Sequence, residues 1–255
     1  MAFGTARGGA SPPHPNPLPA GERVGPDAKR REGEGELRRR YGAPRRLVNC
    51  AVALLAFLLL TNAASSAAPA RILALGDSIT AGYGLPPEEA LPVRLEQRLR
   101  ADGFDAAVIN GGVSGDTTAG GLARLDWVLG ERPQYALVAL GANDALRGLD
   151  PGAAYRNLDR ILARLAAAGV KPLLVGMKAP TNWGRDYQVA FDAIYPKLAA
   201  KYRVPLYPFL LEGVALDARL NQGDGLHPNP AGVAVIVDHL APLVEALLRG
   251  GAKAG

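Results

Sequence analysis

In the stretch Leu73-Ala-Leu-Gly-Asp-Ser-Ile-Thr-Ala-Gly82, an apolar run with the pattern of a strand ends abruptly for the first time in the chain. Arg71 to Leu75 are typical of a buried strand, and Gly76 and Asp77 are typical of the turn that ends it. Ser78 therefore follows directly after the carboxyl end of a predicted strand. Ligands of open α/β sheets bind at that edge. Ser78 is a candidate nucleophile for this reason.

Strand and helix patterns alternate along the chain after Ser78. Unbroken apolar runs such as Tyr135–Leu140 are expected where helices cover both faces of a sheet, and the alternation predicts a parallel sheet. We therefore expect one α/β domain with a three-layer, doubly wound (flavodoxin-like), mostly parallel five-stranded sheet. The expected strands are 71–75, 105–109, 135–140, 172–177 and 204–207, and the expected helices are 88–101, 118–130, 151–168, 186–202 and 230–249, with one or two helical turns over 216–220.

The charge of the chain is concentrated in its first part. The chain has 29 basic and 24 acidic residues, and 19 of each lie within 71–255, so the net charge of +5 comes from residues 1–70. The predicted domain over 71–255 is therefore neutral, which argues against a nucleic-acid partner. Residues 1–46 are rich in Pro, Gly and Arg and cannot bury a core. They are expected to be a disordered tail, or upstream sequence translated from a start codon set too early.

Residues 47–70 have the composition of a secretory signal peptide. The basic pair Arg45-Arg46 precedes an apolar run over Cys50–Leu60, and small residues fill Thr61–Ala70. The alternative is a single membrane anchor, but the run is shorter than the roughly 20 residues that span a bilayer. We expect cleavage between Ala64 and Arg71, a periplasmic or secreted protein, and no stable membrane span afterwards. Cleavage would also remove the only cysteine, which excludes a thiol nucleophile.

Few residues within 71–255 can act as a nucleophile or a base. The serines are Ser78 and Ser114, and the histidines are His227 and His239. A zinc site needs three or four ligands, and two histidines without cysteine do not make one. We therefore expect no metal and no organic cofactor, and the residue types favour a serine and a histidine acting together.

His227 lies in a predicted loop, three residues after Asp224. On a turn, this spacing lets the carboxylate reach the Nδ1–H group of the ring, which leaves Nε2 free for a hydroxyl. His239 falls inside the last predicted helix and is expected to be structural. Ser78 follows a strand directly, whereas Ser114 lies in a glycine-rich loop. We predict Ser78, Asp224 and His227 as catalytic residues; the alternative for His227 is a loop histidine that caps the following helix.

A serine nucleophile also needs hydrogen-bond donors for the oxyanion of the tetrahedral intermediate. The backbone N–H groups of Ser78 and Gly115 and the side-chain amide of Asn143 follow three successive predicted strands. We predict that they converge as an oxyanion hole, although Gly115 alone suits a plain turn and Asn143 alone suits a helix cap. Asp77 and Asp144 are either hydrogen-bond acceptors behind these groups or turn formers.

Four blocks in this order resemble the SGNH (GDSL-type) esterase/lipase superfamily: Gly76–Thr80, Gly115, Gly141–Asp144 and Asp224–His227. The resemblance covers nearly all of residues 71–249. It implies Ser78 as the nucleophile, His227 as the base and Asp224 as the residue that orients it. It also implies an oxyanion hole formed by Ser78, Gly115 and Asn143.

A narrower resemblance is to the bacterial thioesterase I group of this superfamily, also described as protease I, lysophospholipase and arylesterase. The blocks that carry it are Val113–Thr117, Leu122–Leu125, Asn143–Gly148 and Ala193–Leu198. It implies a periplasmic hydrolase of acyl esters and thioesters, with lysophospholipids among the substrates, that acts through an acyl-enzyme. The alternatives are a carbohydrate-acetyl esterase on the same fold and a non-catalytic binding module.

The residues expected to contact an acyl chain lie in two predicted loops. The candidates for the wall of an acyl-chain cavity are Leu146, Pro180, Asn182 and Trp183. Ordinary loop packing is the alternative for each. Ala179 stands before Pro180 where the thioesterase I group carries a larger apolar residue, so the chain-length preference of the group does not carry over to this sequence.

Overall fold

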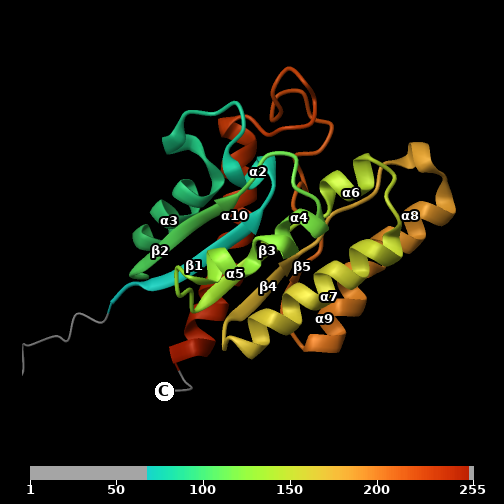
Figure 1. The fold of residues 1–255 in the computed structure, drawn as a ribbon. Helices are drawn as coiled ribbons and strands as arrows, with labels where there is room; N and C mark the ends of the chain where they lie inside the picture. Colours follow the sequence, from blue (N-terminus) through green and yellow to red (C-terminus); the bar gives the residue numbers. More distant parts are fainter. Residues whose placement is uncertain (1–67, 253–255) are drawn as a thin grey trace, which may run out of the picture. The chain divides into compact units, whose positions relative to one another are not determined.

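The computed structural model describes residues 68–252. The predicted tail over 1–46 and the predicted signal peptide, except for its last three residues, lie outside the described part, as do residues 253–255. The described part contains a five-stranded sheet (Figure 1). Its strands are β1 (Ala70–Gly76), β2 (Ala106–Gly112), β3 (Tyr135–Ala139), β4 (Lys171–Val175) and β5 (Leu206–Tyr207).

The strand order is β2-β1-β3-β4-β5, and every neighbouring pair is parallel. The predicted doubly wound, flavodoxin-like topology is therefore confirmed, and the sheet is parallel throughout. The direction of winding reverses between β1 and β3. In such folds the loops after these two strands separate and leave a crevice at the carboxyl edge of the sheet. Ser78 follows β1, and Asn143 follows β3.

Helices cover both faces of the sheet, as expected for strands with unbroken apolar runs. On one face α3 (Leu91–Ala101) packs beside α10 (Pro230–Ala252). On the other face α7 (Pro151–Ala167) packs between α4 (Thr118–Ala123) and α9 (Ile194–Tyr202) (Figure 1). The remaining elements are α2 (Ser78–Ala81), η1 (Pro87–Glu89), α5 (Leu125–Leu129), α6 (Ala142–Leu146), η2 (Thr181–Trp183) and α8 (Arg185–Asp192).

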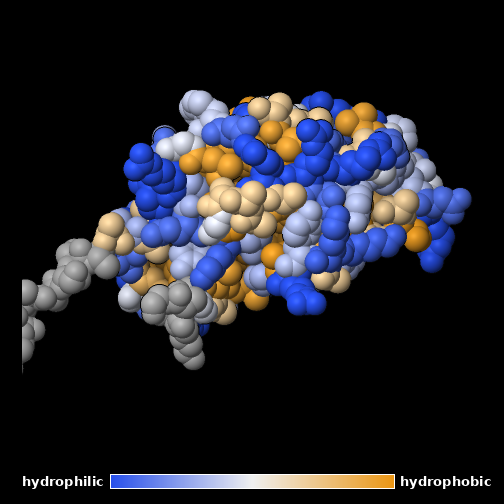
Figure 2. Space-filling view, turned by 60° about the horizontal axis from the view of Figure 1, so that its bottom comes forward, coloured by the Kyte–Doolittle hydropathy of each residue, from blue (hydrophilic) through white to orange (hydrophobic). Residues whose placement is uncertain are grey.

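The apolar side chains of α10 belong to the core of the domain. By length and composition, this helix alone among the described ones could cross a membrane. However, Val233, Ile236, Val237 and Leu240 on its inner face are buried. Packing against the sheet therefore accounts for its hydropathy. The face of the domain shown in Figure 2 carries many hydrophilic residues, with hydrophobic residues in separate groups between them.

Two expected helices are each divided in the structure. The helix expected over 118–130 consists of α4 and α5, which meet at Arg124, and the helix expected over 186–202 consists of α8 and α9, which meet at Ala193. Arg124 leaves the helical conformation, with φ −100° and ψ 2°. Its side chain there makes hydrogen bonds to residues of other segments, which are described below. Tertiary contacts therefore accompany the break at Arg124.

The helical turns expected over 216–220 are absent, and this segment forms a series of hydrogen-bonded turns. The side-chain amide of Asn221 donates to the carbonyl groups of Val214 and Asp217, at 2.7 and 2.8 Å. Leu216 adopts a φ of 66°, a conformation that a helix does not allow. The prediction of helix here was wrong: Leu216 breaks the helical path, and the turns that follow are held by the Asn221 side chain in addition to backbone bonds to the same carbonyl groups.

Candidate active site

A tight connection between β1 and α2 places Ser78 at the carboxyl edge of the sheet. A Cβ atom on Gly76 would lie 2.0 Å from Oγ1 of Thr80, so only glycine lets α2 start this close to the strand. Asp77 caps the helix, because its Oδ1 accepts a hydrogen bond from the N–H of Ile79 at 3.1 Å. Ser78 is the first residue of α2. Its position is thus fixed by the turn before it.

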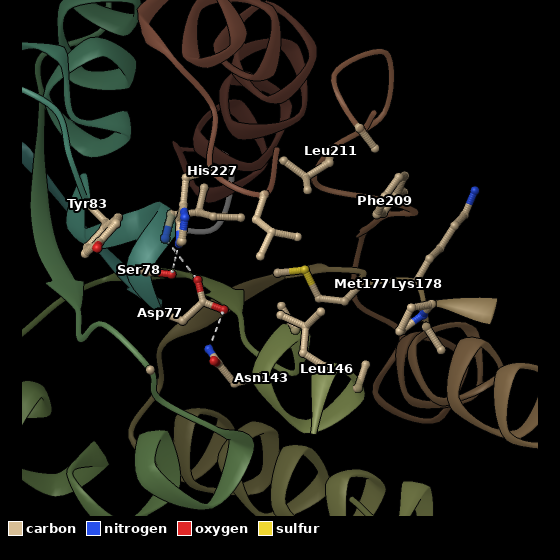
Figure 3. A pocket seen from close by; sticks show the side chains of 18 of the residues that line it. Asp77, Ser78, Tyr83, Asn143, Leu146, Met177, Lys178, Phe209, Leu211 and His227 are labelled. Atoms are coloured by element: carbon tan, nitrogen blue, oxygen red, sulfur yellow. Dashed lines mark hydrogen bonds between the residues drawn. The ribbon is translucent and has the colours of Figure 1, made fainter. Parts of the chain in front are cut away.

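The structure brings Ser78, His227 and Asp224 into one hydrogen-bonded chain, of which Figure 3 shows the contact between Ser78 and His227. Nε2 of His227 lies 2.8 Å from Oγ of Ser78, and Nδ1 lies 2.6 Å from Oδ2 of Asp224. A carboxylate at Nδ1 keeps the proton there, so Nε2 can accept the serine proton. The capping role considered for His227 is filled by Asn229, whose Oδ1 accepts from the N–H of Gly232 at 3.0 Å.

Asp224 is held in its ionised form by its surroundings. Its Oδ1 accepts from the backbone N–H groups of His227 and Leu226, at 3.0 and 2.9 Å. These two hydrogen bonds, and then the bond to the imidazole, lower the pKa of Asp224 to about 2. A carboxylate with this pKa is charged at neutral pH and stabilises an imidazolium when one forms.

The loop that carries His227 is tied to the segment that follows Ser78. The N–H of Gln222 donates to the carbonyl of His227 at 2.8 Å. The side-chain amide of Gln222 donates to the carbonyl of Tyr83 at 2.8 Å. The ring of Tyr83 also packs against the imidazole, with 4.6 Å between the ring centroids. These contacts hold the base and the nucleophile at a fixed separation.

The three predicted oxyanion-hole residues line one cavity together with His227, whereas Asp224 lies outside it. Gly115 has a φ of 81°, a conformation that favours glycine. Within the described part of the chain, no acceptor is bonded to the N–H of Ser78 or of Gly115. Nδ2 of Asn143 donates to the carbonyl of Asp116 at 2.9 Å and approaches Oδ2 of Asp77 at 3.5 Å. The second of these contacts is long for a hydrogen bond, so one amide proton is only weakly engaged.

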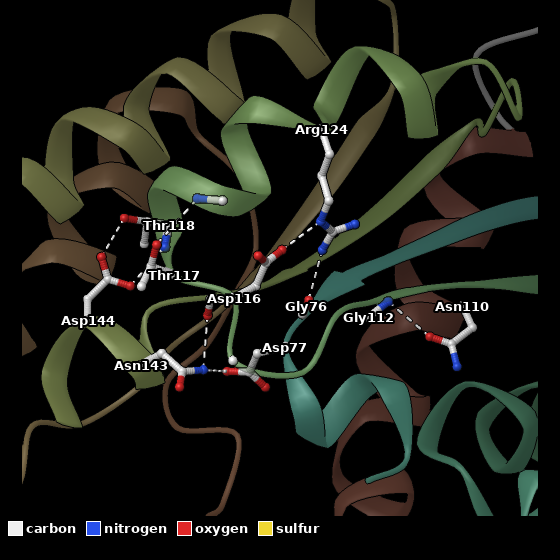
Figure 4. Close-up of polar contacts among 12 residues, drawn as sticks. Gly76, Asp77, Asn110, Gly112, Asp116, Thr117, Thr118, Arg124, Asn143 and Asp144 are labelled. Atoms are coloured by element: carbon white, nitrogen blue, oxygen red, sulfur yellow. Dashed lines mark hydrogen bonds and ion pairs between the residues drawn. The ribbon is translucent and has the colours of Figure 1, made fainter. Parts of the chain in front are cut away.

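Asp77 and Asp144 have different surroundings behind the site. Asp77 is buried and serves as both turn former and hydrogen-bond acceptor. Its burial raises its pKa to about 6, although the hydrogen bond from the N–H of Ile79 and the charge of His227 lower the pKa. Asp144 accepts from N and Oγ1 of Thr118, at 2.8 and 2.7 Å (Figure 4). It therefore ties α6 to α4 and does not reach the cavity.

An apolar cavity of about 500 Å³ extends from Ser78 across the edge of the sheet (Figure 3). Of the four residues expected in its wall, the structure places Leu146 and Pro180 there and leaves Asn182 and Trp183 outside. Asn182 is exposed. A Cβ atom on Gly148 would come 2.8 Å from the Trp183 ring, so that ring covers the backbone of the loop instead of facing the cavity.

Several wall residues were not foreseen from the sequence. Tyr83 and Leu226 come from loops that do not directly follow a strand, and Ala179, already linked to chain length, also lines the wall. Met177, Phe209 and Leu211 lie shortly after the ends of β4 and β5. Their position after a strand was the available signal, but apolar residues at such places equally suit the core. Ser114 also lines the cavity, without a bond to either histidine. His239 lies elsewhere, and its Nδ1 is 3.0 Å from the hydroxyl of Tyr207.

Among the side chains that the structure describes, no group of three or more His, Cys, Asp and Glu residues could hold a metal ion. The site therefore consists of a serine, a histidine, a carboxylate, three hydrogen-bond donors and an apolar cavity. This set can carry out acyl transfer to a serine, with the oxyanion stabilised by the donors.

Several known proteins with similar sequences or structures are named as esterases or thioesterases. The chain is 41% identical over 194 residues to thioesterase 1/protease 1/lysophospholipase L1 of Escherichia coli (strain K12), covering 76% of this chain and 91% of that protein. It is 40% identical over 195 residues to esterase TesA of Pseudomonas aeruginosa, covering 76% of this chain and 96% of that protein.

Among solved structures, AlinE4, an SGNH-hydrolase family esterase, is 48% identical, with a TM-score of 0.60 over 73% of this chain and 96% of that one. The psychrotrophic esterase EstA of Pseudoalteromonas sp. is 32% identical, with a TM-score of 0.67 over 71% of this chain and 99% of that one. Residues 74–235 match the GDSL-like lipase/acylhydrolase family. The chain therefore belongs to the GDSL-like lipase/acylhydrolase family and is a hydrolase of the esterase type.

Proposed function

We propose that this protein hydrolyses carboxylic esters and thioesters through an acyl-enzyme on Ser78. The observation that carries the proposal is the hydrogen-bonded chain from Ser78 through His227 to Asp224, with contacts of 2.8 and 2.6 Å. A serine hydroxyl is a weak nucleophile unless a base takes its proton, and the imidazole is in place to do so.

In the first half-reaction, Oγ of Ser78 attacks the substrate carbonyl carbon, and its proton moves to Nε2 of His227. The negative charge on the carbonyl oxygen is stabilised by the N–H groups of Ser78 and Gly115 and by the amide of Asn143. His227 then gives the proton to the leaving oxygen or sulfur, and the ester bond to Ser78 remains. In the second half-reaction, water attacks this ester, again with His227 as the base, and the acid is released.

The shape of the site favours substrates with an acyl chain. The cavity beside Ser78 is lined mainly by apolar side chains such as Met177 and Leu211, and each buried methylene contributes about 0.8 kcal/mol. An acetyl group on a carbohydrate would leave most of this wall exposed. The names of similar proteins, which include a thioesterase/lysophospholipase and an arylesterase of Vibrio mimicus, support acyl thioesters, lysophospholipids and aryl esters as substrate classes.

The proposal includes export, with a signal peptide within residues 47–70 that is cleaved between Ala64 and Arg71. The apolar run over Cys50–Leu60 after Arg45-Arg46 and the small residues after that run support it. The mature chain would then begin within a few residues of β1, whose first residue is Ala70. Its site would face periplasmic or extracellular acyl esters.

Hydrolysis of p-nitrophenyl acyl esters tests the proposal. Ser78→Ala and His227→Ala should each lower kcat by several orders of magnitude, as for other residues of this kind. The matched control is His239→Ala, which removes the other histidine of the described chain, outside the cavity, and should leave kcat unchanged. Retention of activity in Ser78→Ala would overturn the proposal.

A further inference from the structure

The three donors of the proposed oxyanion hole lie on three separate loops. Ser78 follows β1, Gly115 follows β2 and Asn143 follows β3. Beyond the paired strands, one bond of 3.1 Å from the N–H of Val113 to the carbonyl of Gly76 joins the first two loops and does not reach the third. The donors must nevertheless point at one oxygen to within a few tenths of an ångström to stabilise it. Contacts other than those of the sheet must therefore hold the three loops together.

One ion pair behind the hole makes such contacts. Nε of Arg124 lies 2.6 Å from Oδ2 of Asp116, and Nη2 of the same guanidinium donates to the carbonyl of Gly76 at 3.0 Å (Figure 4). Asp116 directly follows Gly115, and its own carbonyl accepts from the amide of Asn143 at 2.9 Å. The side chains of Arg124 and Asp116 are only 18% and 16% exposed.

The pair links all three donor loops. Through Gly76, Arg124 contacts the end of the strand that presents Ser78, and through the Asp116 carboxylate it contacts the loop that presents Gly115. The backbone of Asp116 then reaches Asn143. Because a guanidinium is planar and donates in two directions, one side chain can satisfy both acceptors, and a lysine ammonium would not reproduce this geometry.

The pair also sets the charge behind the hole. The Asp116 carboxylate lies close enough to Asp77 to raise its pKa. An uncompensated carboxylate here would oppose negative charge developing on a substrate carbonyl. Arg124 compensates that charge, and the low exposure of the pair limits screening by solvent.

We propose that Asp116 and Arg124 are positioning residues of the oxyanion hole, which hold the loops of Ser78, Gly115 and Asn143 in register. The proposal rests on the proposed serine-hydrolase function. It assigns to the pair a role in the rate of acyl transfer and none in binding the acyl chain, because neither residue lines the cavity.

Two conservative variants test the proposal. Arg124→Lys keeps the positive charge but cannot bond both acceptors, and Asp116→Asn keeps the shape and the backbone carbonyl but removes the ion pair. We expect each to lower kcat for p-nitrophenyl butyrate about 10- to 100-fold, with KM changed less than about threefold, because misplaced donors cost rate. The double variant should lose little more than either single one, since both disrupt one unit.

The matched control is Arg98→Lys. Arg98 also bonds two acceptors on different elements, Asp102 and Asp238, but joins α3 to α10 far from the cavity. Its kcat should stay within about twofold of wild type. Two measurements separate loss of folded protein from loss of rate. They are the melting temperature of each variant and the final fraction of the protein that a fluorophosphonate labels.

Affinity for an alkylboronic acid, which forms a tetrahedral adduct with a serine, supplies a measurement that a purely structural role would not move. The inhibition constant should rise in proportion to the loss in kcat/KM for both pair variants and stay unchanged in Arg98→Lys. Unchanged kcat in both variants, a rise in KM alone, or additive losses in the double variant would overturn the proposal. Activity in Ser78→Ala would instead overturn the serine-hydrolase function itself.

Discussion

The cavity makes a quantitative prediction about acyl chain length. If the chain of the substrate lies along the apolar wall, each methylene that enters the cavity contributes about 0.8 kcal/mol. This corresponds to about a fourfold rise in kcat/KM per methylene. From acetate to octanoate, which differ by six methylenes, kcat/KM should therefore rise by about 3 × 10³-fold before the wall is filled.

A larger side chain at Ala179 should shorten the accepted chain. Ala179 lines the cavity and is 6% exposed, and its N–H donates to Oδ1 of Asp192 at 2.9 Å, which fixes the backbone. Ala179→Leu adds three carbons to the wall and should displace about three methylenes of the substrate. The loss for octanoate is then about 2.4 kcal/mol, or about 60-fold in kcat/KM, while acetate and butyrate are unaffected.

The assay is a series of p-nitrophenyl esters from acetate to dodecanoate, each below its critical micelle concentration. The control is Asn182→Leu, which places the same leucine side chain at an exposed residue outside the cavity wall and should leave the profile unchanged. An equal loss at every chain length in Ala179→Leu, or no loss for octanoate, would refute the placement of the acyl chain along this wall.

Three further outcomes follow from the site and from the start of the chain. Because burial raises the pKa of Asp77 from 3.8 to about 6, the folded state keeps a proton that the unfolded state loses between these values, so this group lowers stability as pH rises from about 4 to 6. Asp77→Asn should therefore raise the free energy of unfolding relative to wild type, and this difference should grow from pH 4 to pH 6 to at most about 3 kcal/mol. Urea unfolding of both proteins at pH 4, 5, 6 and 7 measures the difference. A difference that does not change with pH would contradict the prediction. Asp224→Asn should lower kcat by about 10³- to 10⁴-fold at pH 7, because an amide no longer fixes the tautomer of His227, and a loss below tenfold in steady-state assays would argue against this role. The intact mass of protein secreted by cells that express the full chain should correspond to a first residue between 65 and 71, and a mass that retains residues 47–64 would exclude cleavage there.

The topology and the catalytic candidates could be predicted because they depend on local signals. Each apolar run that ends in a Gly-containing turn marks a strand end, and residues 71–255 contain so few serines and histidines that Ser78 and His227 stand out. The spacing of Asp224 to His227 is itself a local feature. These inferences needed no knowledge of which segments pack together.

The cavity wall and the contacts behind the hole depend on tertiary structure, which spacing does not reveal. Trp183 is an aromatic residue in a loop, as a wall residue would be, yet it packs on the backbone at Gly148. Phe209 and Leu211 line the cavity, but in the sequence they resemble core residues. The break in the helix at Arg124 coincides with hydrogen bonds to Gly76, far away in the chain, and to Asp116.

Covalent labelling with a fluorophosphonate, followed by intact mass and peptide mapping, tests the central claim most directly. The account predicts one adduct per chain on Oγ of Ser78, no adduct in Ser78→Ala, and labelling slowed by orders of magnitude in His227→Ala but not in His239→Ala. An adduct on another residue, undiminished labelling of Ser78→Ala, or equal rates in the two histidine variants would contradict it.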